Sequence, residues 1–168
     1  DRLLLLNERG PGGDPNNIGY LSFRDIQQQS RSLERAAAMS YWSPTLGGEG
    51  EALRLTGQRV TSQFFRTLGV QPALGRDFFP EEDSPAEKNS AVILGDGLWR
   101  SRFGGDSAIV GRTIQLSDRA VTVIGVLPRN FESLLAPAAQ IWAPLGYSDG
   151  DAWACRDCRH LRVIARRD

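Results

Sequence analysis

The sequence predicts a mixed α and β (α+β) domain built from two units. Apolar and polar residues alternate in several segments of both halves, as they do in half-buried strands. Two short segments repeat apolar residues at helical spacing and end at glycines, as helices often do. Between the halves, residues 79–88 are polar and carry two prolines, so they form the best internal boundary.

Composition excludes several classes of function. Hydrophobic residues make up 40% of the 168 residues, enough to fill a core. Twenty basic and twenty acidic side chains cancel, so no net charge attracts nucleic acid or an anionic membrane. Apolar runs such as Leu3–Leu6 are far shorter than the roughly eighteen residues of a spanning helix. The chain opens on Asp1 and ends in a strand pattern, so we expect it to be part of a longer protein.

The first unit is expected to run from a strand through a helix and a hairpin to a compact joint. The helix is expected from Phe23 to about Ala36, with a capping box at Ser22–Asp25. The strands are expected at residues 2–7 (buried), 39–46 and 52–60, the last two joined by a turn at 47–50.

The joint that precedes the boundary is expected to hold a short helix. Thr61 or Ser62 would cap this helix, and Gly69 would end it in the left-handed conformation. The rings of Phe78 and Phe79 would then return to the same apolar cluster.

The second unit is expected to be mainly β. Asp96 would cap a helix, and Pro144 indicates that the strand around it lies at an edge of the sheet. The expected elements are a strand at 91–94, a helix from 96 to 104, a hairpin of 112–116 with 120–126, and the edge strand at 141–145. The final strand, at 161–167, is expected to rejoin the sheet of the first unit.

The spacing of Cys155 and Cys158 leaves several interpretations open. In an exported domain a disulfide closing a small loop is favoured, because an oxidising compartment pairs thiols. A redox-active pair activated by nearby arginines, a zinc site with His160, and two free surface thiols are the alternatives. Zinc would have only three ligands here.

No pattern in the sequence indicates an enzyme. No phosphate-binding loop, G-x-S-x-G elbow or H-E-x-x-H motif is present, and His160 is the single histidine. The carboxylates of Glu81–Asp83 and Glu87 do not have the spacing of a calcium loop and are interpreted as a solvated connector. The sequence therefore predicts no catalytic residue, no metal and no cofactor.

Four segments taken in order resemble the MacB-like periplasmic core domain of ABC transporter permeases, in particular the large acidobacterial-type permeases. They are VTSQFFRTLGVQPALGRDF, AVILGDGLWRSRFGGDSAIVGRTIQL, VTVIGVLPRNF and IWAPL, and the resemblance covers roughly residues 22–165.

The resemblance implies two lobes on the periplasmic side of the inner membrane. It implies a porter-like βαβ lobe of residues 1–87 plus 160–168, an inserted Sabre-like lobe of residues 88–150, and a connector of residues 151–159. An inter-lobe hinge would lie near Phe79, Pro80 and Lys88. The implied partners are membrane helices of the same permease, a cytosolic ATPase and outer proteins.

The function implied is non-catalytic. The domain would relay ATP-driven movement from the cytosolic side to substrate or partner proteins outside the membrane. The alternative is a stand-alone extracytoplasmic module that binds a ligand between its lobes. The isolated domain is expected to be a monomer, because the sequence shows no exposed apolar stripe.

Overall fold

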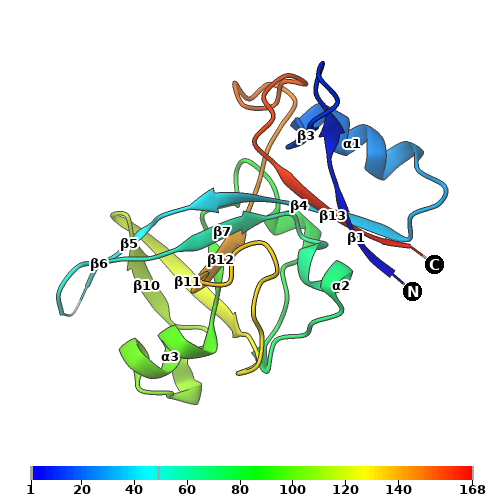
Figure 1. Cartoon of the computed structure of the whole chain (residues 1–168). Helices are drawn as coiled ribbons and strands as arrows, with labels where there is room; N and C mark the ends of the chain where they lie inside the picture. Colours follow the sequence, from blue (N-terminus) through cyan, green and yellow to red (C-terminus); the bar gives the residue numbers. More distant parts are fainter. Residues whose placement is uncertain (1, 49, 168) are drawn as a thin grey trace.

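One sheet of eleven strands organises the part of the chain that the computed structural model describes, residues 2–48 and 50–167 (Figure 1). In spatial order its strands are β1 (Arg2–Leu6), β13 (Arg162–Arg167), β4 (Arg35–Trp42), β7 (Gly57–Val60), β12 (Ile141–Pro144), β9 (Ala91–Leu94), β11 (Arg119–Val126), β10 (Thr113–Leu116), β5 (Thr45–Leu46) and β6 (Leu53–Arg54), with β8 (Leu74–Gly75) joined to β11. A small separate sheet pairs β2 (Glu8–Arg9) with β3 (Pro15–Asn16). The α+β class is confirmed.

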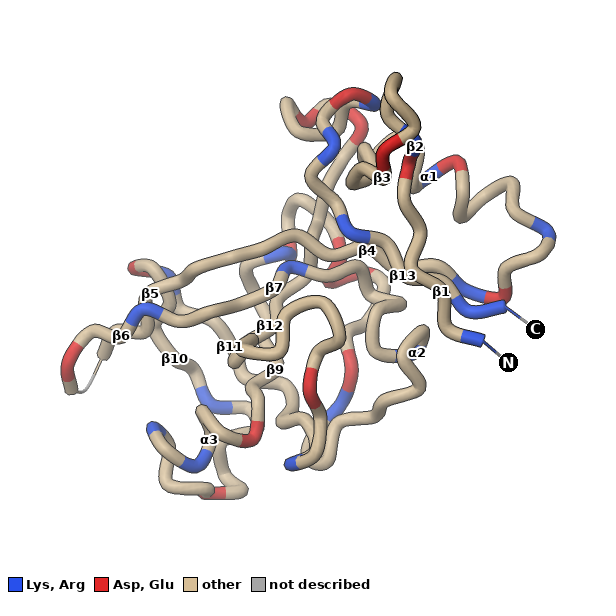
Figure 2. Tube along the Cα trace, in the orientation of Figure 1, with Lys and Arg blue, Asp and Glu red and all other residues tan. Residues whose placement is uncertain are grey.

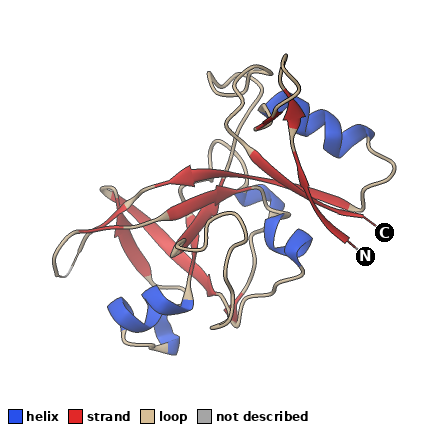
Figure 3. Ribbon diagram, in the orientation of Figure 1, coloured by secondary structure: helices blue, strands red, loops and turns tan. Residues whose placement is uncertain are grey.

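Short helices cover this sheet (Figure 3). They are α1 (Tyr20–Gln29), α2 (Phe64–Leu68) and α3 (Asp96–Phe103), with 3-10 turns η1 (Pro80–Glu82) and η2 (Ser107–Ile109). The expected helix from Phe23 to Ala36 is wrong at both ends, because α1 starts at Tyr20 and stops at Gln29. Ala36 already belongs to β4, where pairing with β13 overrides the helical propensity of the alanines.

The expected helix caps are also wrong, although the C-terminal ends of the second and third helices are confirmed. Gly19, Gln63 and Gly95 precede the three α-helices without a side-chain cap. The hydroxyl of Thr61 instead accepts a hydrogen bond from the Ala38 amide, 3.1 Å away. Ser22–Asp25 lies inside α1, and Asp96 forms an ion pair with Arg100. Gly69 and Gly104 both end helices with positive φ, 75° and 67°, as expected.

The hairpin of the second half turns at Ser117 and Asp118, which both have positive φ, as a two-residue type I′ turn requires. Ile114 lies opposite Val121, as expected. In the first half, the strand expected at 52–60 is divided into β6 and β7, and Leu55 between them is buried in the core. The turn expected at 47–50 includes Glu49, which lies outside the described residues.

The position of β12 contradicts the sequence-based expectation. This strand is not at an edge: it lies between β7 and β9, and its residues are all buried. Pro144 is tolerated because β9 pairs only with Ile141 and Trp142, so the missing N–H of the proline faces no partner there. The strand order ends at β1 and β6. In β1, Leu3 and Leu5 are 36% and 48% exposed, so the expected burial of this strand is wrong.

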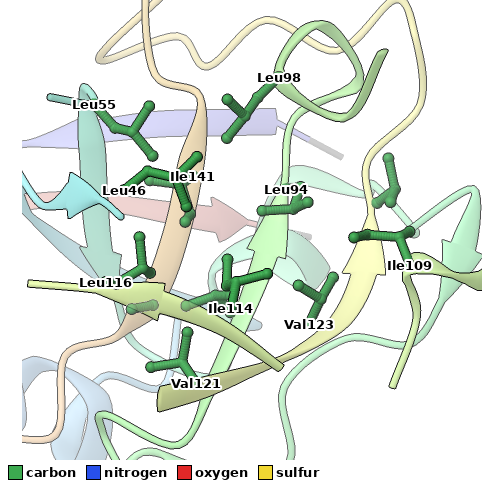
Figure 4. Packing of buried hydrophobic residues seen from close by; sticks show 13 residues of the cluster. Leu46, Leu55, Leu94, Leu98, Ile109, Ile114, Leu116, Val121, Val123 and Ile141 are labelled. Atoms are coloured by element: carbon green, nitrogen blue, oxygen red, sulfur yellow. The ribbon is translucent and has the colours of Figure 1, made fainter. Parts of the chain in front are cut away.

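Three hydrophobic clusters form the core. The first lies inside the curve formed by β9 to β12 and the β5–β6 hairpin, and contains Leu46, Leu94 and Val123 (Figure 4). The second lies under α2 and includes Phe78, as expected. Phe79 was expected in the same cluster, but it is 49% exposed and lies outside it. The third lies between α1 and the strands β4 and β13. As expected, β13 rejoins the strands of the first half.

Candidate functional site

The boundary segment, residues 79–88, connects the two halves of the sheet and is held at both ends by polar contacts. Near its start, Glu82 accepts two hydrogen bonds from the Arg76 guanidinium, at 2.8 and 3.0 Å, and a third from the Phe79 amide. The Arg76 guanidinium also lies 3.8 Å from the centre of the Phe79 ring. This arrangement explains why Phe79 is exposed, since its ring packs against a cation instead of the core.

Asp83 is the central contact of the boundary segment. One of its carboxylate oxygens accepts a hydrogen bond from the Ser62 amide at 2.9 Å, and the other accepts one from the Gly146 amide at 2.7 Å. Burial raises the pKa of Asp83, although both hydrogen bonds act in the opposite direction. One side chain therefore joins the start of α2, the boundary segment and the loop after β12.

Arg59 on β7 holds the other end of the segment. Its guanidinium donates hydrogen bonds to the carbonyl oxygens of Lys88 and Pro144, both at 3.0 Å, and to the side chain of Asn89 at 2.7 Å. Its cationic carbon lies 4.6 Å from the centre of the Trp42 ring. Burial lowers the pKa of Arg59. Asp83 and Arg59 together form what we call the polar clamp.

Three strand pairings connect the first half of the sheet directly with the strands of residues 88–150. Between β7 and β12 four residue pairs are in register, between β8 and β11 two, and between β5 and β10 one. Within the halves, β11 and β9 also share four pairs, and β13 and β4 share five. The polar clamp therefore lies beside the β7–β12 pairing, because Arg59 and its partner Pro144 both belong to these strands.

Residues 147–160, the cysteine loop, follow the clamp and cover the start of α1. Cys155 and Cys158 are joined by a disulfide, and their Cα atoms are 5.2 Å apart. The loop approaches α1 so closely that a Cβ at Gly19 would lie 2.1 Å from the carbonyl oxygen of Arg156. Only glycine fits at this position.

Polar contacts at the surface complete the attachment of the cysteine loop. They are the ion pairs Arg24–Asp149, Arg156–Asp25 and Arg159–Glu8. Tyr20 packs edge-on against Tyr147, with ring centres 5.5 Å apart.

His160 has a structural place at the end of this loop. Its Nδ1 lies 2.8 Å from the Cys158 carbonyl, which can only accept, so Nδ1 carries the proton. In the neutral ring Nε2 then accepts from the Tyr147 hydroxyl, also at 2.8 Å. Burial raises the pKa of Tyr147, which keeps this donor protonated. His160 is thus fully engaged in fixing the loop.

A family model decides the identity of the chain. The model of the MacB-like periplasmic core domain matches residues 1–160, nearly the whole sequence. The chain belongs to this family. As a MacB-like periplasmic core domain it is part of an ABC-type transporter permease and lies on the extracytoplasmic side of the membrane. No curated protein has a significantly matching sequence.

Solved structures with low sequence identity share the fold of this core domain. The periplasmic region of MacB from Actinobacillus actinomycetemcomitans has a TM-score of 0.70 at 15% identity, covering 99% of this chain and 74% of the other. A domain from Porphyromonas gingivalis, described as part of a permease, has 0.76 at 16% identity, covering 100% and 76%. The extracellular domain of the noncanonical ABC-type transporter YknZ from Gram-positive bacteria has 0.69 at 15% identity, covering 99% and 84%.

Within residues 2–48 and 50–167, no group of three or more His, Cys, Asp or Glu side chains is arranged to hold a metal ion. Over the same residues, no helix is long and apolar enough to cross a membrane. The carboxylates of the boundary segment differ from one another: Glu81 and Glu87 are exposed, whereas Asp83 is half-buried. The expected solvated connector is therefore wrong for Asp83, and also for Glu82, whose side chain pairs with Arg76.

Sequence reasoning missed the polar clamp. The partners of Asp83 lie 21 and 63 residues away along the chain, and those of Arg59 lie 29, 30 and 85 residues away. Neither residue lies in a local pattern that indicates such contacts. The one available signal was the polar boundary itself, which was expected to contain a hinge at Phe79, Pro80 and Lys88.

Proposed function

We propose that this periplasmic core domain is non-catalytic and relays ATP-driven movement of its permease to substrate or partner proteins outside the membrane. The observation that carries the proposal is the family match over residues 1–160. The sequence has no nucleotide-binding motif, so in this proposal ATP is bound by a cytosolic ATPase domain or subunit. Membrane helices of the same permease would transmit the movement.

The proposal includes two lobes and a hinge. The lobes would be residues 1–87 plus 160–168 and residues 88–150, joined by residues 151–159. The hinge would lie near Phe79 and Pro80 at one end of the boundary segment and Lys88 at the other. The irregular backbone of the boundary segment supports this position, because the segment joins the two proposed lobes along the chain and contains only the 3-10 turn η1.

Hydrophobic packing between the two proposed lobes limits how far they can move. The first two hydrophobic clusters contain residues of both proposed lobes, such as Leu46 with Val92 and Phe65 with Ile93. Breaking such contacts exposes apolar surface and is costly. A small rotation that keeps the clusters intact fits these contacts better than a wide opening, so the domain would act as a stiff lever.

Spin labels test the relay in the intact permease with its ATPase. Gln28 on α1 and Ser101 on α3 are exposed, lie in different proposed lobes, and can be changed to cysteine for labelling. Pulsed electron–electron distance measurements should give different label separations with ATP and with ADP. Identical distance distributions in every nucleotide state would contradict a movement between the lobes.

A matched pair separates movement between lobes from movement within one. Labels at Ser101 and Asp118 both lie in the second proposed lobe, so their separation should stay constant.

The isolated domain is expected to be a monomer, which light scattering checks. A stable dimer of the domain alone would contradict this part of the proposal.

A further inference from the structure

Three basic residues from separate parts of the chain line one small cavity. The cavity has a volume of about 110 Å³, and its basic residues are Arg59, Lys88 and Arg119. Arg59 belongs to β7, Lys88 is the last residue of the boundary segment, and Arg119 is the first residue of β11. The fold therefore brings three cations that are distant in sequence to one space.

No carboxylate within residues 2–48 and 50–167 forms an ion pair with any of these three cations. The ion pairs of that part of the chain all involve other basic residues. Glu87 and Asp118, which directly precede Lys88 and Arg119, are both exposed. Basic and acidic residues are intermixed over much of the chain (Figure 2). A group of cations without a carboxylate partner is therefore a distinct feature of this cavity.

The larger cavity beside α2 shows the opposite arrangement. Its volume is about 450 Å³, and Arg35, Arg66 and Arg76 line it. Each of these arginines already has a carboxylate partner. The ion pairs are Glu34–Arg35, Asp77–Arg66 and Glu82–Arg76. The fold itself balances the charges of the larger cavity, whereas it leaves those of the smaller one unbalanced.

The guanidinium of Arg59 has donors that the fold does not use. Its hydrogen bonds to the Lys88 and Pro144 carbonyls and to the Asn89 side chain occupy both hydrogens of Nη1 and one of Nη2. A guanidinium has five N–H donors, so Nε–H and the second Nη2–H have no acceptor among the described residues. All three acceptors are neutral. Burial lowers the pKa of Arg59, and the like charge of Arg119 lowers it further, so a bound anion would offset both effects.

Two neutral side chains add further donors to the cavity. Asn89 accepts from Arg59 through Oδ1, which leaves the hydrogens of its Nδ2 available. The Ser117 hydroxyl accepts from the Thr45 amide at 3.2 Å, and its own hydrogen has no acceptor among the described residues. The polar side chains around the cavity therefore offer hydrogen-bond donors together with positive charge.

Apolar residues form the remaining lining, and the space is small. Val92, Leu116, Val121 and Ala143 line the cavity and are all buried. Apolar surroundings lower the local dielectric constant, so attraction between opposite charges is stronger there than in water. A volume of about 110 Å³ equals that of nearly four water molecules at roughly 30 Å³ each, which fits an anion of about five non-hydrogen atoms. A whole nucleotide or lipid is too large.

We propose that this cavity binds a doubly charged tetrahedral oxyanion, of which inorganic phosphate is the example. Arg59 and Arg119 would donate hydrogen bonds to its oxygens, because guanidinium groups match such oxyanions in planar, paired hydrogen bonds. Lys88 would add a third positive charge, and Asn89 and Ser117 would donate further hydrogen bonds. Two negative charges balance this group of cations better than the single charge of a carboxylate does.

The proposed anion would lie between the two proposed lobes. Arg59 belongs to residues 1–87, whereas Lys88 and Arg119 belong to residues 88–150. A bound oxyanion would connect β7 with the start of β11 and resist separation of the lobes. Only this consequence rests on the proposed function; the site itself rests on the cavity and its charges.

Calorimetric titration of the 168-residue domain with sodium phosphate tests the site. We expect saturable binding of one phosphate per chain, and sulfate should compete with it. R119Q should bind phosphate at least about tenfold more weakly, because it loses charge-assisted hydrogen bonds. R119K keeps the charge but not the planar fork, so its affinity should be intermediate. R129Q is the matched control and should bind as the wild type does, because Arg129 is also exposed but follows the other end of β11.

Nuclear magnetic resonance locates the bound phosphate. Trp42 lines the cavity, and its ring lies 4.6 Å from the guanidinium carbon of Arg59. The signals of the Arg59 Nε–H and the Trp42 indole N–H should therefore shift during the titration, with the same saturation as in calorimetry. The indole of Trp153 in the cysteine loop is 66% exposed and should not shift.

Any of four results would overturn the proposal. They are no saturable binding to the wild type, equal affinity for acetate or chloride, unchanged affinity in R119Q, and signal shifts confined to residues outside the cavity. These titrations involve neither nucleotide nor movement of the lobes. Their failure would leave the relay untouched, and failure of the relay would leave the binding result standing.

Discussion

The boundary segment and the cysteine loop are both irregular, yet they are held in different ways. The boundary segment is fixed by half-buried polar groups, chiefly the polar clamp of Asp83 and Arg59. The cysteine loop is fixed by a covalent link, a close backbone approach at Gly19 and partly exposed ion pairs. Because hydrogen bonds gain strength with burial and exposed ion pairs do not, the two segments should respond differently to mutation, pH and reductant.

Substitution of Gly146, where the boundary segment meets the loop after β12, should reduce the free energy of unfolding the most. An added Cβ would lie 2.3 Å from Lys88 Cβ and 2.8 Å from the Ser84 carbonyl, and φ is +61°. Gly146→Ala should reduce the free energy of unfolding by roughly 3–4 kcal/mol, measured by urea denaturation. Gly104→Ala is the control, because its φ is +67° but a Cβ would meet nothing within 4 Å. It should cost only roughly 1–2 kcal/mol.

Loss of the clamp carboxylate should have the next largest effect. Asp83→Ala leaves the Ser62 and Gly146 amides without their acceptor, so unfolding should become easier by roughly 2–3 kcal/mol. The exposed neighbour Glu81 provides the control, and Glu81→Ala should stay within about 0.5 kcal/mol of the wild type. Equal losses in both variants would show that Asp83 has no special role.

Loss of the disulfide in the cysteine loop should reduce the free energy of unfolding by less than the loss of the Asp83 carboxylate does. The link spans only three positions, so loop closure contributes roughly 1–2 kcal/mol. The double variant C155S/C158S and the reduced wild type should both lose this amount, while the oxidised native domain should show no thiol that reacts with Ellman's reagent. An identical unfolding midpoint with and without reductant would contradict this prediction.

The pH dependence of stability gives a further test of Asp83 in the boundary segment. Burial raises the pKa of Asp83 above its ordinary value of 3.8, so the folded state binds this proton more tightly than the unfolded state does. The contribution of Asp83 to stability is therefore greatest below the ordinary pKa and declines as the pH rises through the raised pKa. The difference in unfolding free energy between wild type and Asp83→Ala should shrink over that window. If this difference in unfolding free energy grew with pH, it would contradict a raised pKa of Asp83 in the folded state.

The smallest effect is expected for the exposed ion pairs of the cysteine loop. Asp25→Asn removes the 2.7 Å contact with Arg156, whose side chain is 57% exposed. Unfolding free energy should change by less than about 0.5 kcal/mol, and by even less at high salt. A loss above 1 kcal/mol in urea denaturation would show that this contact is far stronger than its exposure implies.

Local patterns in the sequence predicted much of the fold but little of its long-range order. Alternation and glycine signals located β9, the β10–β11 hairpin and the ends of α2 and α3. Pro144 suggested an edge strand, because no local signal reveals that β9 pairs with only part of β12. The alanines of β4 have high helical propensity, and only pairing with β13 makes them a strand.

The candidate sites show the same limit. The close spacing of Cys155 and Cys158 suggested their pairing, whereas Asp83 and Arg59 act through partners distant in sequence. A net charge of zero suggested no attraction to anionic membranes. It did not indicate that the fold places Arg35, Arg66 and Arg76 along one cavity beside α2, because a net charge carries no information about where the charges lie.

The relay through the boundary segment can be tested most directly by amide hydrogen exchange in the intact permease, with ATP and with ADP. The proposal predicts that the Ser62 and Gly146 amides, which donate to Asp83, change their exchange rates with the nucleotide state. The amides of the buried strand β9 should exchange equally slowly in both states. Unchanged exchange at Ser62 and Gly146 would contradict a relay that passes through this segment.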